Sequence, residues 1–396
     1  GGGPGGGRGV KELPEEVRQR GRRVADLLRG AWRPSPGPAS LSARELEAMT
    51  PLLLRNGSGG LAWHRLKDSS LRDHPGALRL RDAYRLQTLR VRELEAVLSG
   101  VGSRLRAHGV EGALAKGWGV GRLYPAPGLR PYGDLDLLVR PGELDRVRQI
   151  LEREEPGALA HLELHTDFDT LEDRSTEELL EARIEAPLQG TEIPLLAPED
   201  HLRLLCLHGL KHGLCRPLWL CDLGAFMDTL PDGFDWGRAM TGDAWASRGV
   251  RGALAVAGAL LGVSLAGVPA AWRREEPPDW MLEATLEAFG ARTHYMEGLH
   301  PGDLLLEPRS LVRGAGLRWS NPLEVAYRRR LPWGRRPGTL ARTLDYALRG
   351  AGFVLRLPLH LPALLVSRRA AQRKGKEGED GWREVSRRIS PREPGA

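Results

Sequence analysis

Cysteine is rare in this sequence of 396 residues, which contains three: Cys206, Cys215 and Cys221. An odd number of cysteines confined to one short stretch does not form the disulfide framework of a small secreted protein. We therefore expect reduced thiols and a cytoplasmic location.

Long apolar runs are also missing. The most apolar stretch late in the sequence, residues 353–366, is interrupted by Arg356, Pro358, His360 and Pro362. It is too short and too broken for a membrane-spanning helix, which needs about 20 consecutive apolar residues. The N-terminal GGGPGGGRG is a flexible, low-complexity tail without the apolar core of a signal peptide. We expect no transmembrane segment.

Aromatic residues make up 6% of the chain, and lysine is scarce among its 58 basic residues. The formal charge of +7 invites a nucleic-acid partner. Acidic residues are interleaved with the arginines, however, and the sparse aromatics provide no stripe for base stacking. A nucleic-acid partner is therefore an alternative that the composition does not favour.

Hydrophobic periodicity predicts helices before and after residues 110–197, where the pattern of apolar residues changes. The second of these helices has Ser42 at its start and Glu45 three residues later, the pattern of a capping box. The expected helices cover residues 10–32, 41–54, 82–108, 201–214, 218–230, 244–261 and 279–290.

In residues 110–197, short apolar runs alternate with short helical stretches. Strands are expected at 110–115, 134–139 and 159–165, helices at 118–124 and 141–153, and an edge strand at 191–196. This order predicts an α+β fold in which a small mixed-sheet core is embedded between mostly α-helical segments.

Five regions follow from these expectations. They are a flexible tail, helix and linker at 1–40, a helical region at 41–109, the α/β core at 110–197, a helical domain at 198–300, and an Arg- and Pro-rich region with a disordered tail at 301–396.

Two aspartates open the strand GDLDLLV. Because alternate residues of a strand share a face, Asp134 and Asp136 point the same way, while Leu135 and its alternates face the core. Adjacent carboxylates repel each other unless a cation lies between them, and their hard oxygens suit Mg²⁺. Glu163, on the next expected strand, can supply a third carboxylate, and His165 shares its face. Three such carboxylates can organise an attack on phosphorus, with Glu163 as metal ligand or base.

Upstream, Lys116 and Gly117 close the first expected strand. A glycine at a strand-to-helix junction lets backbone N–H groups approach a phosphate, and the lysine adds a positive charge. Arg130 can contact a phosphate as well. Each residue also has a plainer interpretation: Lys116 as a solvated strand end, and Arg130 as the ion-pair partner of Asp134 or Glu143.

His208, His212 and Cys215 fall on one face of an expected helix. A zinc site is conceivable there, but the spacing matches no known finger or ribbon. We favour a role as core or substrate-facing residues.

The stretch LAKGWGVGRLYPAPGLRPYGDLDLLV, followed by LELH, resembles the uncharacterised nucleotidyltransferase family of the polymerase-β-like superfamily, whose motifs are LKG, Y-P, R-P-x-x-D-x-D-L-L-V and L-H-W. The resemblance covers roughly residues 40–230. It implies transfer of a nucleoside monophosphate from an NTP, with pyrophosphate leaving. It also implies that Gly117 is the phosphate-loop glycine, that Asp134 and Asp136 are metal ligands, and that Glu163 is the third carboxylate.

Two positions depart from the family pattern. Gly117-Trp118 stands where the superfamily usually has Gly-Ser or Gly-Gly, and Leu164-His165-Thr166 stands where the family has L-H-W. We therefore expect a Mg²⁺-dependent nucleotidyltransferase with an NTP donor, ATP by preference, and an unidentified hydroxyl acceptor. The alternatives are a catalytically silent member that binds NTP as a regulatory module, and an RNA-modifying enzyme.

Overall fold

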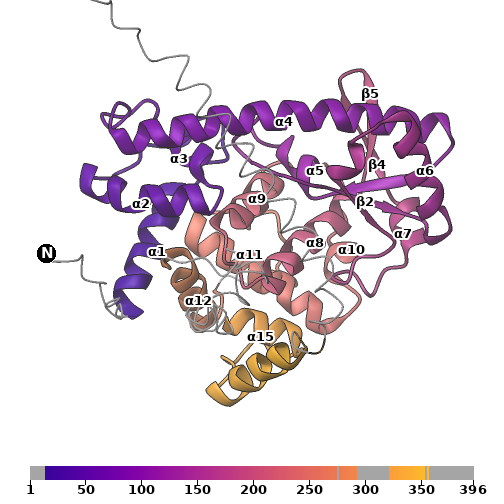
Figure 1. The fold of residues 1–396 in the computed structure, drawn as a ribbon. Coiled ribbons are helices and arrows are strands. Elements are labelled where there is room, and N and C mark those ends of the chain that lie inside the picture. Colours follow the sequence, from indigo (N-terminus) through magenta and orange to yellow (C-terminus); the bar gives the residue numbers. More distant parts are fainter. Residues whose placement is uncertain (1–13, 274–275, 292–320, 353–354, 356–396) are drawn as a thin grey trace, which may run out of the picture. The chain divides into compact units, whose positions relative to one another are not determined.

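The computed structural model describes residues 14–273, 276–291, 321–352 and 355. Two compact units divide the chain: residues 1–294 with 321–337, and residues 295–320 with 338–396. In the second unit the described residues include a helix at 339–352. The first unit contains the sheet (Figure 1). Every predicted site residue also falls within its residue ranges. The predicted N-terminal and C-terminal tails lie outside the described residues.

Between residue 14 and the sheet, the chain forms α1 (Pro14–Leu28), α2 (Ala43–Arg55), α3 (Gly59–Leu66) and α4 (Pro75–Ala107). The predicted capping box at Ser42 and Glu45 is present at the start of α2. Helix α4 begins seven residues earlier than its periodicity predicts. Pro75 occupies its first turn, and the His74 side chain accepts a hydrogen bond from the N–H of Gly76, which satisfies one of the unpaired donors of a helix start.

Helix α4 connects two hydrophobic cores. Near its start, Ala77 and Leu80 pack in a helical core, whereas Leu94, Leu98 and Val101 pack against the sheet. Its contacts accordingly run from α2 and α3 to α6 and β5 (Figure 1). The long helix therefore ties the N-terminal helices to the α/β core.

The sheet has five strands: β1 (Gly112–Ala115), β2 (Leu135–Val139), β3 (Leu162–His165), β4 (Ile184–Leu188) and β5 (Thr191–Leu195). Their order is β3-β2-β1-β5-β4, with β1–β2 and β4–β5 antiparallel and β2–β3 and β1–β5 parallel. The short helices α5 (Gly117–Gly121), α6 (Leu144–Glu154) and α7 (Thr176–Glu181) connect them. The predicted α+β class, with a small mixed sheet between helical segments, is confirmed.

The strand predicted at residues 191–196 is present at 191–195, but the prediction that it lies at the edge of the sheet is wrong. Strand β5 lies between β1 and β4, and the unpredicted β4 forms the edge. Gln189 and Gly190 both have positive φ and form a tight hairpin turn between the two strands. Pro187 is tolerated in β4 because an edge strand can leave one N–H position unpaired.

The helices that the structure describes in the rest of this unit are α8 (Pro198–Lys211), α9 (Pro217–Met227), α10 (Trp236–Met240), α11 (Ala244–Leu261), α12 (Asp279–Gly290) and α15 (Pro322–Arg328). Helix α8 follows β5 directly and is buried along most of its length. Its Leu204 packs with Ala115 and Leu138 of the sheet, whereas Leu205 and Cys206 lie in the helical core. Helix α8 thus joins the sheet to the helices that follow.

All three cysteines are free thiols and buried. Across the described ranges, no helix combines the length and the apolar character needed to cross a membrane.

Candidate functional site

Asp136 and Glu163 are brought together by strand register. Strands β2 and β3 are parallel, and Asp136 lies opposite Glu163. The alternation of β2 places Leu135, Leu137 and Val139 in the core beneath the sheet, so that Asp136 faces the other side, as its sequence pattern predicts. The Asp136 side chain is 5% exposed and that of Glu163 is 60% exposed. The two carboxylates therefore lie at the border between the interior and solvent.

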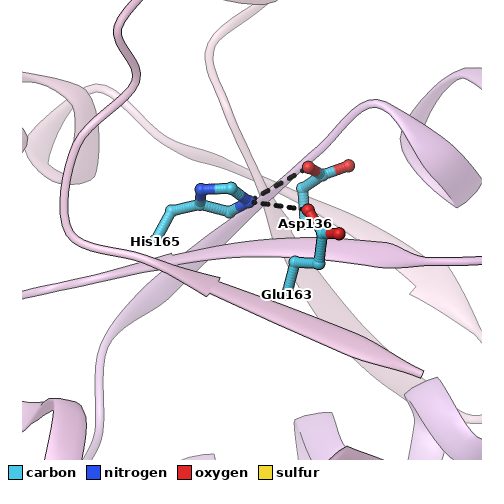
Figure 2. A group of neighbouring side chains, drawn as sticks. All are labelled: Asp136, Glu163 and His165. Carbon is cyan, nitrogen blue, oxygen red and sulfur yellow. Dashed lines mark hydrogen bonds and ion pairs between the residues drawn. The ribbon is translucent and has the colours of Figure 1, made fainter. Parts of the chain in front are cut away.

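His165 completes a group of three with these carboxylates (Figure 2). One ligand atom from each residue lies within 4.8 Å of the other two. Among the His, Cys, Asp and Glu side chains that the structure describes, these three form the group whose ligand atoms lie close enough together to hold a metal ion. His165, which shares a face with Glu163 in the sequence pattern, thus lies beside both carboxylates.

Asp136 is surrounded by positive and hydrogen-bonding groups. Its Oδ1 lies 2.7 Å from Lys116 Nζ and 3.1 Å from His165 Nε2. Burial alone would raise the pKa of Asp136, but the hydrogen bond with His165 and the charge of Lys116 outweigh it and hold the pKa below its usual value. Asp136 is therefore ionised at neutral pH.

The Lys116–Gly117 turn joins β1 to α5 in an unusual conformation. Lys116 has φ 51° and ψ −139°, and Gly117 has φ 37°. A side chain on Gly117 would approach the carbonyl oxygen of Asp134 to 3.0 Å. The neighbouring Trp118 is 3% exposed and packs in the core beneath the sheet, so its bulky ring does not cover the turn. Gly117 is buried together with Trp118, and Lys116 is the half-buried residue of the turn.

A pocket of about 350 Å³ opens beside the three-residue group. Its wall combines Lys116, Glu163 and His165 with the loop after β3 and with one side of α8, including His208 and Lys211. Lys211 forms an ion pair with Asp169 of that loop. The sequence pattern indicated neither the loop residues nor Lys211, because nothing local shows that α8 lies across from β3.

Asp134 is placed differently from Asp136. It precedes β2 and is exposed, and its carboxylate is not part of the three-residue group. Its role as a metal ligand stays a prediction.

Arg130 is buried, and its guanidinium pairs with Asp222 of α9 at 3.0 Å. The Tyr124 hydroxyl donates to the same carboxylate at 2.7 Å. The expected pairing with Asp134 or Glu143 is therefore wrong, since the ion-pair partner comes from a helix far along the chain. A phosphate contact by Arg130 stays a prediction.

His208 and His212 form an aromatic group with Trp219. The two imidazole centroids are 4.6 Å apart, and both rings lie within 5.6 Å of the indole. Burial lowers the pKa of both histidines, that of His212 to about 4, so both rings are neutral at pH 7. Within the described residues they do not form a three-ligand metal group with the buried Cys215.

The site lies in an α+β domain in which the adjacent parallel strands β2 and β3 bring two carboxylates and an imidazole together. A family model described as an uncharacterised nucleotidyltransferase matches residues 42–261, more than half of the chain, and the protein belongs to that family. The match begins at the N-cap of α2 and ends at the last residue of α11. Comparison with curated proteins and with solved structures finds no significant match.

Proposed function

We propose that this protein transfers a nucleoside monophosphate from an NTP to a hydroxyl acceptor and releases pyrophosphate. The observation that carries the proposal is the register pairing of Asp136 with Glu163, with His165 beside them, inside a nucleotidyltransferase-family domain. ATP is the donor to test first.

The three-residue group fits a divalent cation. Asp136 and Glu163 offer carboxylate oxygens, which suit Mg²⁺ or Mn²⁺, and His165 offers an imidazole nitrogen, which suits Mn²⁺ better than Mg²⁺. A cation held there would supply positive charge to phosphate oxygens at the reacting phosphorus. Asp134, exposed directly before β2, is kept in the proposal as a further ligand.

The other residues bind phosphate and move a proton. Lys116, at the pocket wall, is within reach of a triphosphate that lies next to Asp136, and Gly117, buried at the same turn, is kept in the proposal as the phosphate-loop glycine. The acceptor oxygen would attack the α-phosphorus as the bond to pyrophosphate breaks. Glu163 is exposed enough to accept the proton of the acceptor hydroxyl.

One observation favours a second candidate, a silent family member that binds NTP without transferring it. Lys116 Nζ lies 2.7 Å from Asp136 Oδ1, so an internal cation already covers an oxygen that a metal would need. If Lys116 stays there when nucleotide binds, transfer is blocked.

The test is pyrophosphate release and label transfer from each α-³²P NTP with Mg²⁺ or Mn²⁺, comparing the native protein with Asp136→Asn. The matched control is Asp145→Asn, since this aspartate is exposed on α6 and pairs only weakly with Arg148. Metal-dependent transfer that is lost in Asp136→Asn and kept in Asp145→Asn is the expected result. Binding of ATP and GTP without any transfer would favour the silent member, and the absence of both would overturn the proposal.

A further inference from the structure

One residue of α8 contacts the backbone of the Lys116–Gly117 turn. The N–H of Lys116 donates a hydrogen bond to Nε2 of His201 at 2.9 Å, across 85 positions of sequence. Because Nε2 accepts, the ring proton of the neutral imidazole lies on Nδ1. Helix α8 thereby reaches the turn that carries Lys116.

The His201 ring is enclosed on several sides. It is 2% exposed, and its edge packs against the ring of Phe226 with centroids 5.4 Å apart. A side chain at Gly119 would lie 2.9 Å from His201 Cε1, so only glycine leaves room for the ring. Burial and the charges of Arg122, Arg130 and Lys116 lower the pKa of His201 to about 3. The ring therefore remains an acceptor over the whole physiological pH range.

The turn itself needs such support. A non-glycine residue with the φ of Lys116 is in a sparsely populated backbone region, which persists only when surrounding structure holds it. The same residue places its ammonium against Asp136. A change in the backbone of Lys116 would therefore move a charge at the candidate site.

We propose that His201 is a positioning residue, which accepts the N–H of Lys116 and so holds the Lys116–Gly117 turn in the conformation that binds the triphosphate of an NTP. This inference rests on the proposed function for its ligand. Its structural half, that His201 orders the turn, is independent of any nucleotide.

The structural half is tested by amide hydrogen exchange in the peptide that contains Lys116. We compare the native protein with His201→Leu, which removes the acceptor, and His201→Gln, whose amide oxygen can take the place of Nε2. Exchange at the turn should be about tenfold faster in His201→Leu and close to native in His201→Gln. Unchanged exchange in His201→Leu would overturn the inference.

The ligand half is tested by calorimetric binding of inorganic triphosphate with Mg²⁺. Affinity should fall about tenfold in His201→Leu and recover in His201→Gln. Cys206→Ala is the matched control, because Cys206 is fully buried on the same helix but lies in the helical core. A loss of equal size in all three variants would mean a general loss of stability and would overturn the positioning role. If the native protein binds no triphosphate, the proposed function fails, and the exchange comparison alone decides whether His201 holds the turn.

Discussion

Lys116 and Asp136 face each other at the end of the β1–β2 ladder, with Nζ 2.7 Å from Oδ1. The antiparallel register pairs Ala115 with Asp136, so Lys116 is the first residue beyond the ladder. Its positive φ turns the chain there, and its side chain returns to the carboxylate. The acid best placed to bind a metal is thus neutralised by a cation of the same chain.

Lys116→Met should therefore strengthen metal binding in the absence of nucleotide. The Lys116 ammonium lies a few ångströms from the place of a cation at Asp136, and at an effective dielectric constant of about 20 two such positive charges repel each other by several kcal/mol. Without this repulsion, the affinity for Mn²⁺ should rise by about tenfold or more. Titration of free Mn²⁺ by electron paramagnetic resonance measures this. Lys67→Met, at a half-exposed lysine that pairs with Asp68, is the control and should behave as native. Equal Mn²⁺ affinities in all three proteins would contradict a competition between Lys116 and the metal.

Glu163→Gln and Asp134→Asn separate two sets of metal ligands. The group of Asp136, Glu163 and His165 contains Glu163 and lacks Asp134. Glu163→Gln should therefore weaken Mn²⁺ binding about tenfold or more, in the range found when a supporting metal contact is lost. Asp134→Asn should have a smaller effect without nucleotide. If Asp134→Asn is the more damaging variant in the same titration, the spacing Asp134-x-Asp136 describes the ligands better than the register of β2 and β3.

The ion pair of Arg130 with Asp222 should be a major source of stability. Among the described residues, Arg130→Met leaves the buried Asp222 carboxylate with the neutral Tyr124 hydroxyl as its side-chain donor. Breaking such a pair costs about 3–5 kcal/mol of unfolding free energy. Tyr124→Phe should cost about 1 kcal/mol. Urea denaturation gives both values. A variant Arg130→Met with near-native stability but weaker NTP binding would instead support the predicted phosphate contact.

Stability should fall when the pH decreases below about 6.5, the ordinary pKa of histidine. Burial lowers the folded-state pKa of His201 to about 3, and the charges of Arg122, Arg130 and Lys116 add to the effect. Below pH 6.5 the unfolded chain binds a proton at this position and the folded protein does not, so the free energy of unfolding decreases toward pH 3.

For His201 alone the loss is about 2 kcal/mol between pH 6.5 and pH 5. Denaturation across this pH range should give a shallower slope for His201→Gln than for the native protein. Parallel slopes would mean that His201 is protonated in the folded state.

The sequence by itself determined the features that depend on near neighbours along the chain. Helices α11 and α12 begin and end where their periodicity predicts, and the Ser42–Glu45 capping box forms as expected. The alternation of β2 is also local, and it correctly separates Asp136 from Leu135 and Leu137. The motif around these residues was enough to indicate the family.

Only the tertiary structure decided which distant residues meet. The register of β2 against β3 pairs Asp136 with Glu163, and the packing of α8 and α9 against the α/β core brings His201 to Lys116 and Asp222 to Arg130. These contacts join residues up to 92 positions apart. Neither periodicity nor capping encodes strand order or the direction of helix packing. Those are set by the burial of apolar faces over the whole unit, which also left Asp134 exposed while Asp136 became buried.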